Sequence, residues 1–225
     1  MALPGSGMIW LSQMRDEFGN WGPPNYLSHY YRGQLTTANN LNVPASGPIY
    51  FSQFFGAVRS VAGSWSRTSP GTYSFTVPAY STLRIDVRGA GGGGGGSTYD
   101  AGAAGSNGTA GGAATVSGTG LRGNGGSAGQ GSYYNKPAKA TNGSASGGNV
   151  LNSTGGGANG GVGGTYGATK GGDGGDGGRA VSDYGPGAIA VGTTLTVTVP
   201  TGGNGGAGQV AGAKGTNGAV YISWS

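Results

Sequence analysis

Hydrophobic and polar residues alternate with a period of two in four short stretches. In Phe75-Thr76-Val77 and in Ile85-Asp86-Val87, for example, every second residue is apolar. This period places alternate side chains on opposite faces of a β-strand. The pattern predicts strands at 72–77, 82–88, 194–199 and 219–224, with a turn at 78–81 between the first two. We therefore expect a mainly β fold with a β-sandwich-like frame.

A second pattern occurs three times near the N-terminus, at 10–14, 26–30 and 50–54. Each copy has an aromatic residue, then Leu or Phe, then Ser, then Gln or His, then a large apolar residue. A Ser hydroxyl at a helix N-cap accepts from free backbone N–H groups. The sequence thus predicts short helices and turns at roughly 12–18, 28–32 and 52–57, capped by Ser12, Ser28 and Ser52 and stopped by Gly19, Gly33 and Gly56. Helices this short need to pack on one another or on a partner.

Glycine divides the chain into two parts. Of the 56 Gly residues, 9 lie in residues 1–88 and 47 in residues 89–225, whereas 14 of the 21 aromatic residues precede Gly89. Large rings supply most of the hydrophobic stabilisation that a core can gain. The second part must therefore be held by backbone hydrogen bonds, or be disordered.

Gly-Gly-X triplets at 160–165, 171–179 and 202–207 have a period of three. An extended threefold helix has three residues per turn and no internal hydrogen bonds, so its N–H and C=O groups need lateral partners. We expect polyglycine II-type helices and loops in a glycine-rich insert at about 89–193, enclosed by the strands. Collagen is a weaker alternative because it needs strict Gly-X-Y and abundant Pro. Disorder is the other alternative.

The composition argues against most catalytic and metal chemistry. The chain has no Cys and only one His, His29, so disulfides, thiolate nucleophiles and sites with two imidazoles are excluded. Gly89–Gly94 matches a nucleotide-binding glycine pattern, but no helical pattern follows it, and no acidic residue occurs between Asp100 and Asp173. Asp173 and Asp176 match the start of a calcium-binding repeat that has no tandem copy here. We expect no enzymatic activity, no catalytic residues, no cofactor and no metal.

Charge and the loop residues favour recognition. The 12 basic and 7 acidic residues give a net charge of +5, which is sparse for a nucleic-acid-binding protein. Stretches with Tyr, and in two cases Lys, lie between the glycine tracts at 97–100, 132–139, 165–170 and 181–186. Loops rich in Tyr, Ser, Gly and Asn on a rigid frame are typical of protein recognition. Solvated turns are the alternative for each loop.

These patterns together resemble bacteriophage tail proteins. Residues 11–19, 27–33 and 49–56 resemble a module common at the start of phage tail and tail-fibre proteins. Residues 75–92 and 218–224 look like the strand, glycine-rich insert and strand plan of phage glycine-rich tail proteins. The Gly-Gly-X tracts are similar to those of the distal tail-fibre adhesins of T-even-like phages. In that family the N-terminal part attaches to the fibre, polyglycine helices form the body, and loops bind an outer-membrane receptor of the host.

The resemblance implies a virion-attachment module at 1–68 and a receptor-binding domain at 69–225. Candidate receptor-binding residues are Tyr99, Tyr133, Tyr134, Lys136, Lys139, Tyr166, Lys170 and Tyr184. Candidate attachment residues are Trp10, Leu11, Met14, Phe18, Tyr30, Tyr31, Phe51, Phe54 and Phe55.

The expected partners are other phage tail or fibre proteins and a host outer-membrane protein or surface glycan, without nucleic acid. We expect a homotrimer or a monomer that caps a trimeric fibre. The expected location is the virion tail or tail fibre, after synthesis in the host cytoplasm, since the N-terminus lacks a signal-peptide pattern. A purely structural tail, collar or decoration protein without receptor contact is the main alternative. An ice- or polysaccharide-binding protein and a glycan depolymerase are weaker ones.

Overall fold

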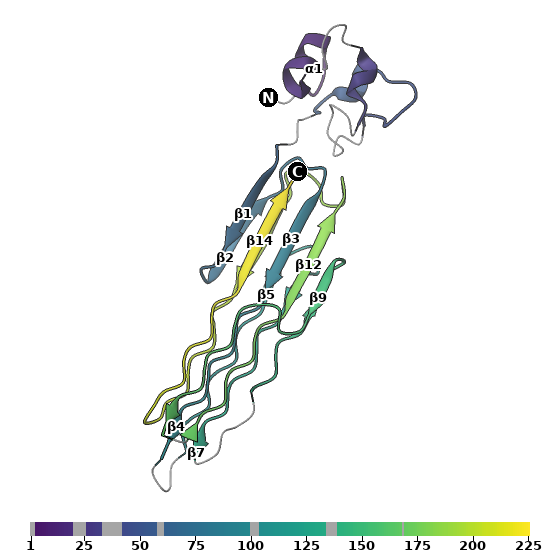
Figure 1. Cartoon of the computed structure of the whole chain (residues 1–225). Helices are drawn as coiled ribbons and strands as arrows, with labels where there is room; N and C mark the ends of the chain where they lie inside the picture. Colours follow the sequence, from purple (N-terminus) through teal and green to yellow (C-terminus); the bar gives the residue numbers. More distant parts are fainter. Residues whose placement is uncertain are drawn as a thin grey trace.

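The computed structural model describes residues 3–19, 26–32, 42–57, 61–99, 104–133, 139–167 and 169–225. A small helical module, a β-sandwich and a glycine-rich body follow one another along a long axis (Figure 1). The C-terminus lies at the end of the sandwich that faces the helical module. No helix of these residues is long and apolar enough to span a membrane.

The N-terminal module contains one α-helix and two 3-10 helices. They are α1 (Leu11–Phe18), η1 (Leu27–Tyr30) and η2 (Phe51–Phe54). The prediction of three short helices is confirmed, but the prediction of Ser N-caps is wrong. The N-caps are the aromatic residues Trp10, Tyr26 and Tyr50, and each Ser lies at the second helical position. The backbone N–H of each aromatic N-cap instead donates to the side chain of the Gln or His three residues later. In the first helix, the backbone N–H of Trp10 donates to Gln13 Oε1 at 2.8 Å.

Three aromatic rings pack together in the core of this module. The rings of Phe18, Tyr30 and Phe54 lie 6.4–6.5 Å from one another, centre to centre. Such edge-to-face and tilted pairs add to the stabilisation from burial. The buried cluster consists of Leu3, Ile9, Met14, Phe18, Tyr30, Val43, Phe54 and Ala57.

The β-sandwich consists of two five-stranded antiparallel sheets. The first has the order β1 (Gly63–Arg67), β14 (Ala219–Trp224), β3 (Leu83–Arg88), β12 (Arg179–Tyr184) and β9 (Leu151–Ser153). The second has the order β2 (Gly71–Thr76), β13 (Thr194–Val199), β5 (Ala114–Val116), β6 (Arg122–Gly123) and β8 (Ala145–Ser146). A mainly β fold with a sandwich-like frame is therefore present, and the four predicted strands are β2, β3, β13 and β14.

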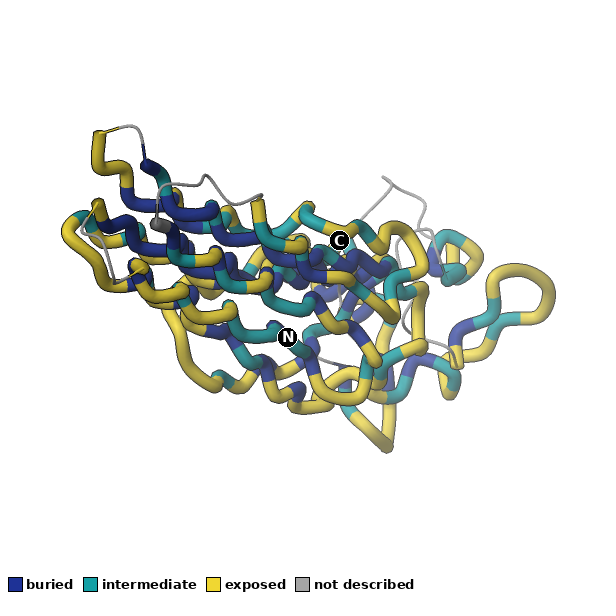
Figure 2. Tube along the Cα trace, turned by 90° about the horizontal axis from the view of Figure 1, so that it is seen from below, coloured by how far each residue is buried: buried dark blue, intermediate teal, exposed yellow. Residues whose placement is uncertain are grey.

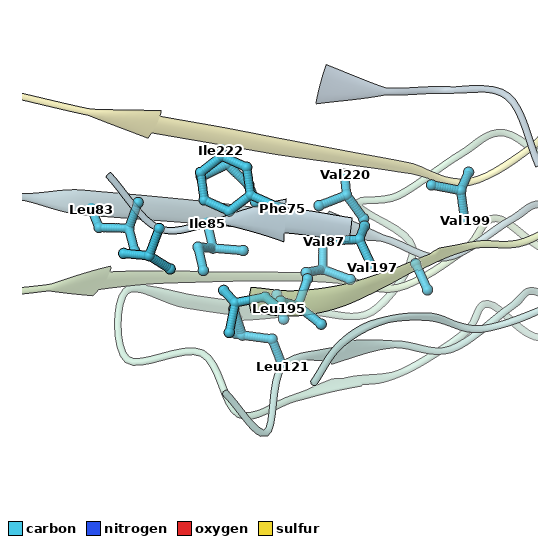
Figure 3. Packing of buried hydrophobic residues seen from close by; sticks show 14 of the residues in the cluster. Phe75, Leu83, Ile85, Val87, Leu121, Leu195, Val197, Val199, Val220 and Ile222 are labelled. Carbon is cyan, nitrogen blue, oxygen red and sulfur yellow. The ribbon is translucent and has the colours of Figure 1, made fainter. Parts of the chain in front are cut away.

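The core of the sandwich follows the alternation seen in the sequence. Ile85 and Val87 of β3 are fully buried, and they belong to the same cluster as Phe75, Leu195 and Val197 of the opposite sheet (Figure 3). Strands β2 and β3 lie in different sheets, so the predicted turn at 78–81 carries the chain across the sandwich.

Two sequence-based boundaries need correction. Strand β1 pairs with β14 over its whole length, so the sandwich begins at Gly63 and the N-terminal module ends before it, not at residue 68. The glycine-rich insert is not a single loop, because the chain returns to the sandwich within 89–193 to form β5, β6, β8, β9 and β12. The run Ser182-Asp183-Tyr184 at the end of β12 made its sequence look like a recognition loop.

The glycine-rich body consists of eight extended segments that continue the sandwich strands. The segments are 89–97, 104–112, 124–132, 139–144, 157–164, 171–178, 200–207 and 210–218. The first leaves directly from β3 and the last leads directly into β14. Most of their residues belong to no helix or strand, although the interior is buried (Figure 2).

Backbone hydrogen bonds around segment 89–97 recur every three residues. Its N–H groups point in turn toward segments 171–178, 104–112 and 210–218. The first series joins Gly89 to Gly178, Gly92 to Gly175 and Gly95 to Gly172, with N···O distances of 2.8–2.9 Å. Its carbonyl groups accept, with the same step, from segments 124–132, 157–164 and 200–207. Six segments thus surround the central one.

These six segments also bond to each other in a closed ring. Going around the centre the order is 104–112, 124–132, 171–178, 157–164, 210–218 and 200–207, which bonds again to 104–112. Neighbours in the ring run in opposite directions, since segments that leave the sandwich alternate with segments that return to it. The expectation that this region is ordered is met by these bonds.

Close approach of the backbones explains why the central segment is glycine. A Cβ atom on Gly93 would lie 1.9 Å from the carbonyl oxygen of Asn204, and one on Gly92 would lie 1.9 Å from that of Ser127. Such distances are far below van der Waals contact. Between Ala90 and Ser97 the central segment therefore consists of glycine alone.

Candidate recognition surface

The connections between outgoing and returning segments meet at the end of the body farthest from the N-terminal module (Figure 1). Two small sheets mark this end. Strand β4 (Ser97–Thr98) pairs in parallel with β7 (Ser132–Tyr133), and β10 (Thr165–Tyr166) pairs antiparallel with β11 (Thr169–Lys170). Three of the four Tyr-containing stretches predicted from the sequence reach this end. We call it the tip.

Two tyrosines from different connections come together at the tip. The rings of Tyr99 and Tyr166 are 6.3 Å apart, and the residues are 51% and 43% exposed. The Tyr99 N–H donates to Gln209 Oε1 at 3.0 Å, which joins a third connection to the pair. The tip therefore exposes aromatic surface on backbone that is held in place.

The two candidate lysines at the tip form ion pairs with the body. Lys139 Nζ lies 2.6 Å from Asp176 Oδ2, and Lys170 Nζ lies 2.9 Å from Asp173 Oδ1. These aspartates occupy the X positions of the Gly-Gly-X triplets. Their carboxylates also accept backbone N–H groups of segment 157–164, from Gly160 and Gly163 respectively, at 2.8 Å. Both lysines thus secure the bases of tip connections.

The environment of Asp176 favours its ionised form. Burial disfavours the charged carboxylate, but the hydrogen bonds from Lys139 and from the Gly160 N–H outweigh it, so the pKa of Asp176 lies below its usual value. Beside Lys139 the surface has a hollow of about 290 Å³. It is lined by Ser127, Ala128, Gln130, Lys139, Ala140 and Thr141.

The other candidate receptor residues differ in position. Tyr133 lies in β7 at the tip, and its side chain is outside the described part, as are Tyr134 and Lys136. Tyr184 does not join the tip. It ends β12 at the opposite end of the sandwich, packs against the core and donates from its hydroxyl to Thr119 O at 3.4 Å.

The candidate attachment residues divide into buried and exposed groups. Met14, Phe18, Tyr30 and Phe54 are at most 3% exposed, so they hold the module together and cannot form its contact surface. Leu11, Tyr31 and Phe55 are partly exposed. Trp10 and Phe51 are 61% and 42% exposed.

Sequence reasoning missed two exposed aromatic residues in this module. Tyr26 and Tyr50 are 58% and 61% exposed and occupy the same repeat position as Trp10. The shared position was visible in the sequence. The expected Ser N-caps placed each helix start two residues too late, which left the aromatic position without a role.

Within the described ranges, no group of three or more His, Cys, Asp or Glu side chains could hold a metal ion. No protein family model, curated protein or solved structure matches this chain. Its function must therefore be argued from its own residues.

Proposed function

We propose that this chain is a non-enzymatic adhesin of a phage tail or tail fibre that binds a receptor on the host bacterial surface. The observation that carries the proposal is the exposed aromatic surface at the tip. Tyr99 and Tyr166 are exposed there, side by side, on connections tied to a hydrogen-bonded body. Tyrosine offers large contact area at small cost in side-chain entropy. The N-terminal module, at the other end of the molecule, attaches the chain to the particle.

In this proposal the glycine-rich segments are polyglycine II-type helices packed on a hexagonal plan. The three-residue step of the hydrogen bonds around segment 89–97 supports this description, because a threefold helix directs successive N–H groups to three different neighbours. A body packed in this way is stiff without a hydrophobic core. It therefore holds the tip in a shape suited to its receptor before binding.

Several weak contacts would act together on a phage particle. If each particle carries multiple copies, attachment by one tip raises the effective concentration of the others at the cell surface. The net charge of +5 assists approach to an anionic cell envelope in a salt-dependent manner.

Competition for adsorption tests this function. Purified protein is added to host cells before the phage, and the remaining phage adsorption is measured. The double variant Tyr99→Ala/Tyr166→Ala should compete at least about tenfold less well. The matched control is Tyr221→Ala, an exposed tyrosine on the sandwich, which should compete like the wild type.

The same assay separates the adhesin from the structural alternative. A purely structural tail protein would not bind cells, and infection would stay normal after replacement of Tyr133, Tyr134 and Lys136. If binding persists in the double variant but is lost when Tyr133, Tyr134 and Lys136 are replaced, the receptor contact would lie in the connection that contains these three residues.

A further inference from the structure

The glycine-rich body contains six Asn-Gly dipeptides, whereas residues 1–88 contain none. They begin at Asn107, Asn124, Asn142, Asn159, Asn204 and Asn217. Asparagine before glycine is a chemically labile pair, because glycine has no side chain to hinder attack by its backbone nitrogen on the asparagine Cγ. The body therefore carries six positions at which its chain can be modified without an enzyme.

The modification is a deamidation that consumes water and releases ammonia. The backbone nitrogen of the glycine bonds to the asparagine Cγ and gives its proton to a solvent base, while the Cγ–Nδ2 bond breaks and the leaving nitrogen takes a proton from solvent. Water then opens the five-membered imide. Cleavage of the new Cγ–N bond gives aspartate, and cleavage of the original peptide C–N bond gives isoaspartate. Hydrogen bonds that hold the asparagine carboxamide or the glycine N–H in place oppose the first step.

At three of the six dipeptides both reacting groups are held. The Oδ1 of Asn142 accepts from the Asp176 N–H at 2.9 Å, and the Gly143 N–H donates to Asp176 O at 2.7 Å. Asn107 and Asn217 have corresponding hydrogen bonds to their carboxamides and from the following N–H groups. These side chains also satisfy backbone N–H groups of neighbouring segments, so their position is part of the body's own bonding.

At two further dipeptides one reacting group is held. The carboxamide of Asn124 donates to Ser144 Oγ at 2.9 Å. At Asn159 it is the following N–H that is held, because the Gly160 N–H donates to Asp176 Oδ1 at 2.8 Å. In both cases attack requires the loss of a hydrogen bond of a reacting group.

At Asn204 neither reacting group is held. The residue is exposed, and within the described part of the chain neither its carboxamide nor the Gly205 N–H has a hydrogen-bond partner. Only the main chain of Asn204 is fixed, by Thr109. The Thr109 Oγ1 accepts from the Asn204 N–H at 2.7 Å, and the Thr109 N–H donates to Asn204 O at 2.8 Å.

We infer that Asn204 is a site of spontaneous deamidation in the folded protein, and that the folded body protects the other five Asn-Gly dipeptides. This inference does not depend on the proposed function. An isoaspartate at position 204 lengthens the main chain of segment 200–207 by one methylene group. The Gly203 N–H bonds to Gly91 O and the Gly206 N–H to Gly94 O, at 2.9 and 2.8 Å. The longer chain cannot keep both bonds, so the isoaspartate form has a weaker body.

Peptide mapping by mass spectrometry tests the inference. The purified full-length protein is incubated in mildly alkaline buffer, samples are digested at acidic pH, and deamidation is quantified at all six dipeptides of each sample. Asn204 should deamidate at least about tenfold faster than the other five, since each of them must first lose a hydrogen bond. The control is the same incubation in denaturant, where the six rates should become similar.

Two results would overturn the inference. One is a rate at Asn204 no faster than at the other five dipeptides of the folded protein. The other is the same order of rates in denaturant, because the local sequence and not the fold would then set them.

Variants give a second test. Thr109→Val removes the hydroxyl that holds the Asn204 N–H and should accelerate deamidation at Asn204 alone, by up to about tenfold. Thr201→Val, at an exposed threonine of the same segment, is the matched control and should leave the rate unchanged. Incubated wild type should melt at a lower temperature than fresh protein, whereas Asn204→Gln should not change on incubation, because glutamine closes a larger ring more slowly. Acceleration at all six sites in Thr109→Val, or an equal fall in melting temperature in Asn204→Gln, would contradict a single labile site.

Discussion

The sandwich and the glycine-rich body are continuous in the chain but are stabilised in different ways. In the sandwich, strands such as β3 bury Ile85 and Val87 against the opposite sheet. One residue after β3 ends, the same chain enters segment 89–97, where Gly91–Gly96 are all buried and contribute no side chains. There the neighbours are backbones, held by hydrogen bonds with a step of three. At Arg88 the chain thus passes from a region stabilised by side-chain packing to one stabilised by backbone hydrogen bonds.

This difference implies opposite responses to mutation. A side-chain core is weakened most by removing atoms, because cavities remain. A backbone-packed body is weakened most by adding them, since no space exists between the segments. Ordering glycine also costs more backbone entropy than ordering other residues, so the body depends on its complete set of hydrogen bonds.

The largest effect is expected for Gly93→Ala. The added Cβ would lie 1.9 Å from the Asn204 carbonyl oxygen, and it would push segment 200–207 away from the central segment. We expect a loss of about 5 kcal/mol in the free energy of unfolding, measured by denaturant unfolding. Hydrogen exchange should show faster exchange in 89–97 and its neighbours than in the sandwich.

The control for this prediction is Gly185→Ala. Gly185 is exposed, and a Cβ there would have no atom within 4 Å. Its stability should stay within about 0.5 kcal/mol of the wild type. Equal stability of both variants would show that the central segment has room to move, and the contrast between the two regions would fail.

In the sandwich, removal of side-chain atoms from the core should reduce stability. Ile85→Ala removes a fully buried side chain of β3 and should reduce the free energy of unfolding by about 3 kcal/mol. The conservative variant Ile85→Val should lose about 1 kcal/mol. If both variants unfold like the wild type, side-chain packing is not what stabilises this region.

The two regions also differ in how well they could be predicted from sequence. The alternation of Phe75 and Val77, or of Ile85 and Val87, predicted β2 and β3 because each apolar side chain faces the core. The shortest strands, such as β6 with Arg122–Gly123, have no such pattern. The triplets indicated a period of three in the body. They could not indicate which segments would be neighbours, because glycine carries no side chain to distinguish one neighbour from another.

The tip was predicted only in part, because the sequence does not show which segments lie side by side. Tyr99 and Tyr166 were recognised as loop residues, since they interrupt glycine tracts. Their pairing, and the ion pairs of Lys139 and Lys170, depend on which segments lie side by side. That Tyr184 belongs to a strand depends on the pairing of β12 with β3, which its polar residues concealed.

A charged cluster lies where the two regions join. Asp86 is 8% exposed and accepts hydrogen bonds from both Arg88 and Arg179. Burial alone would raise the pKa of Asp86, but the two guanidinium groups outweigh it and hold the pKa below its usual value. Because the pKa is lower in the folded state, the stabilisation is complete above the unfolded value of about 4. It is lost as the pH falls through the folded pKa.

Asp86→Asn should therefore reduce stability at neutral pH by about 2 kcal/mol, since both arginines lose their charged partner. Between pH 7 and acid, the variant should show a smaller decrease of stability than the wild type. The measurement is the free energy of unfolding against pH. Identical pH profiles would mean that Asp86 does not contribute to the acid sensitivity.

The smallest effect is expected at the tip, from Lys139→Met. Lys139 is half exposed, and pairs of this kind contribute about 0.5 kcal/mol. Asp176 keeps its bond from the Gly160 N–H in the variant, so segment 157–164 retains its place in the ring. Lys214→Met, an exposed residue of segment 210–218, is the matched control for loss of one positive charge. A loss above about 2 kcal/mol in Lys139→Met alone would show that this side chain stabilises the body itself. The body would then depend on side chains as the sandwich does, and the distinction between the two regions would hold only for the segments inside the ring.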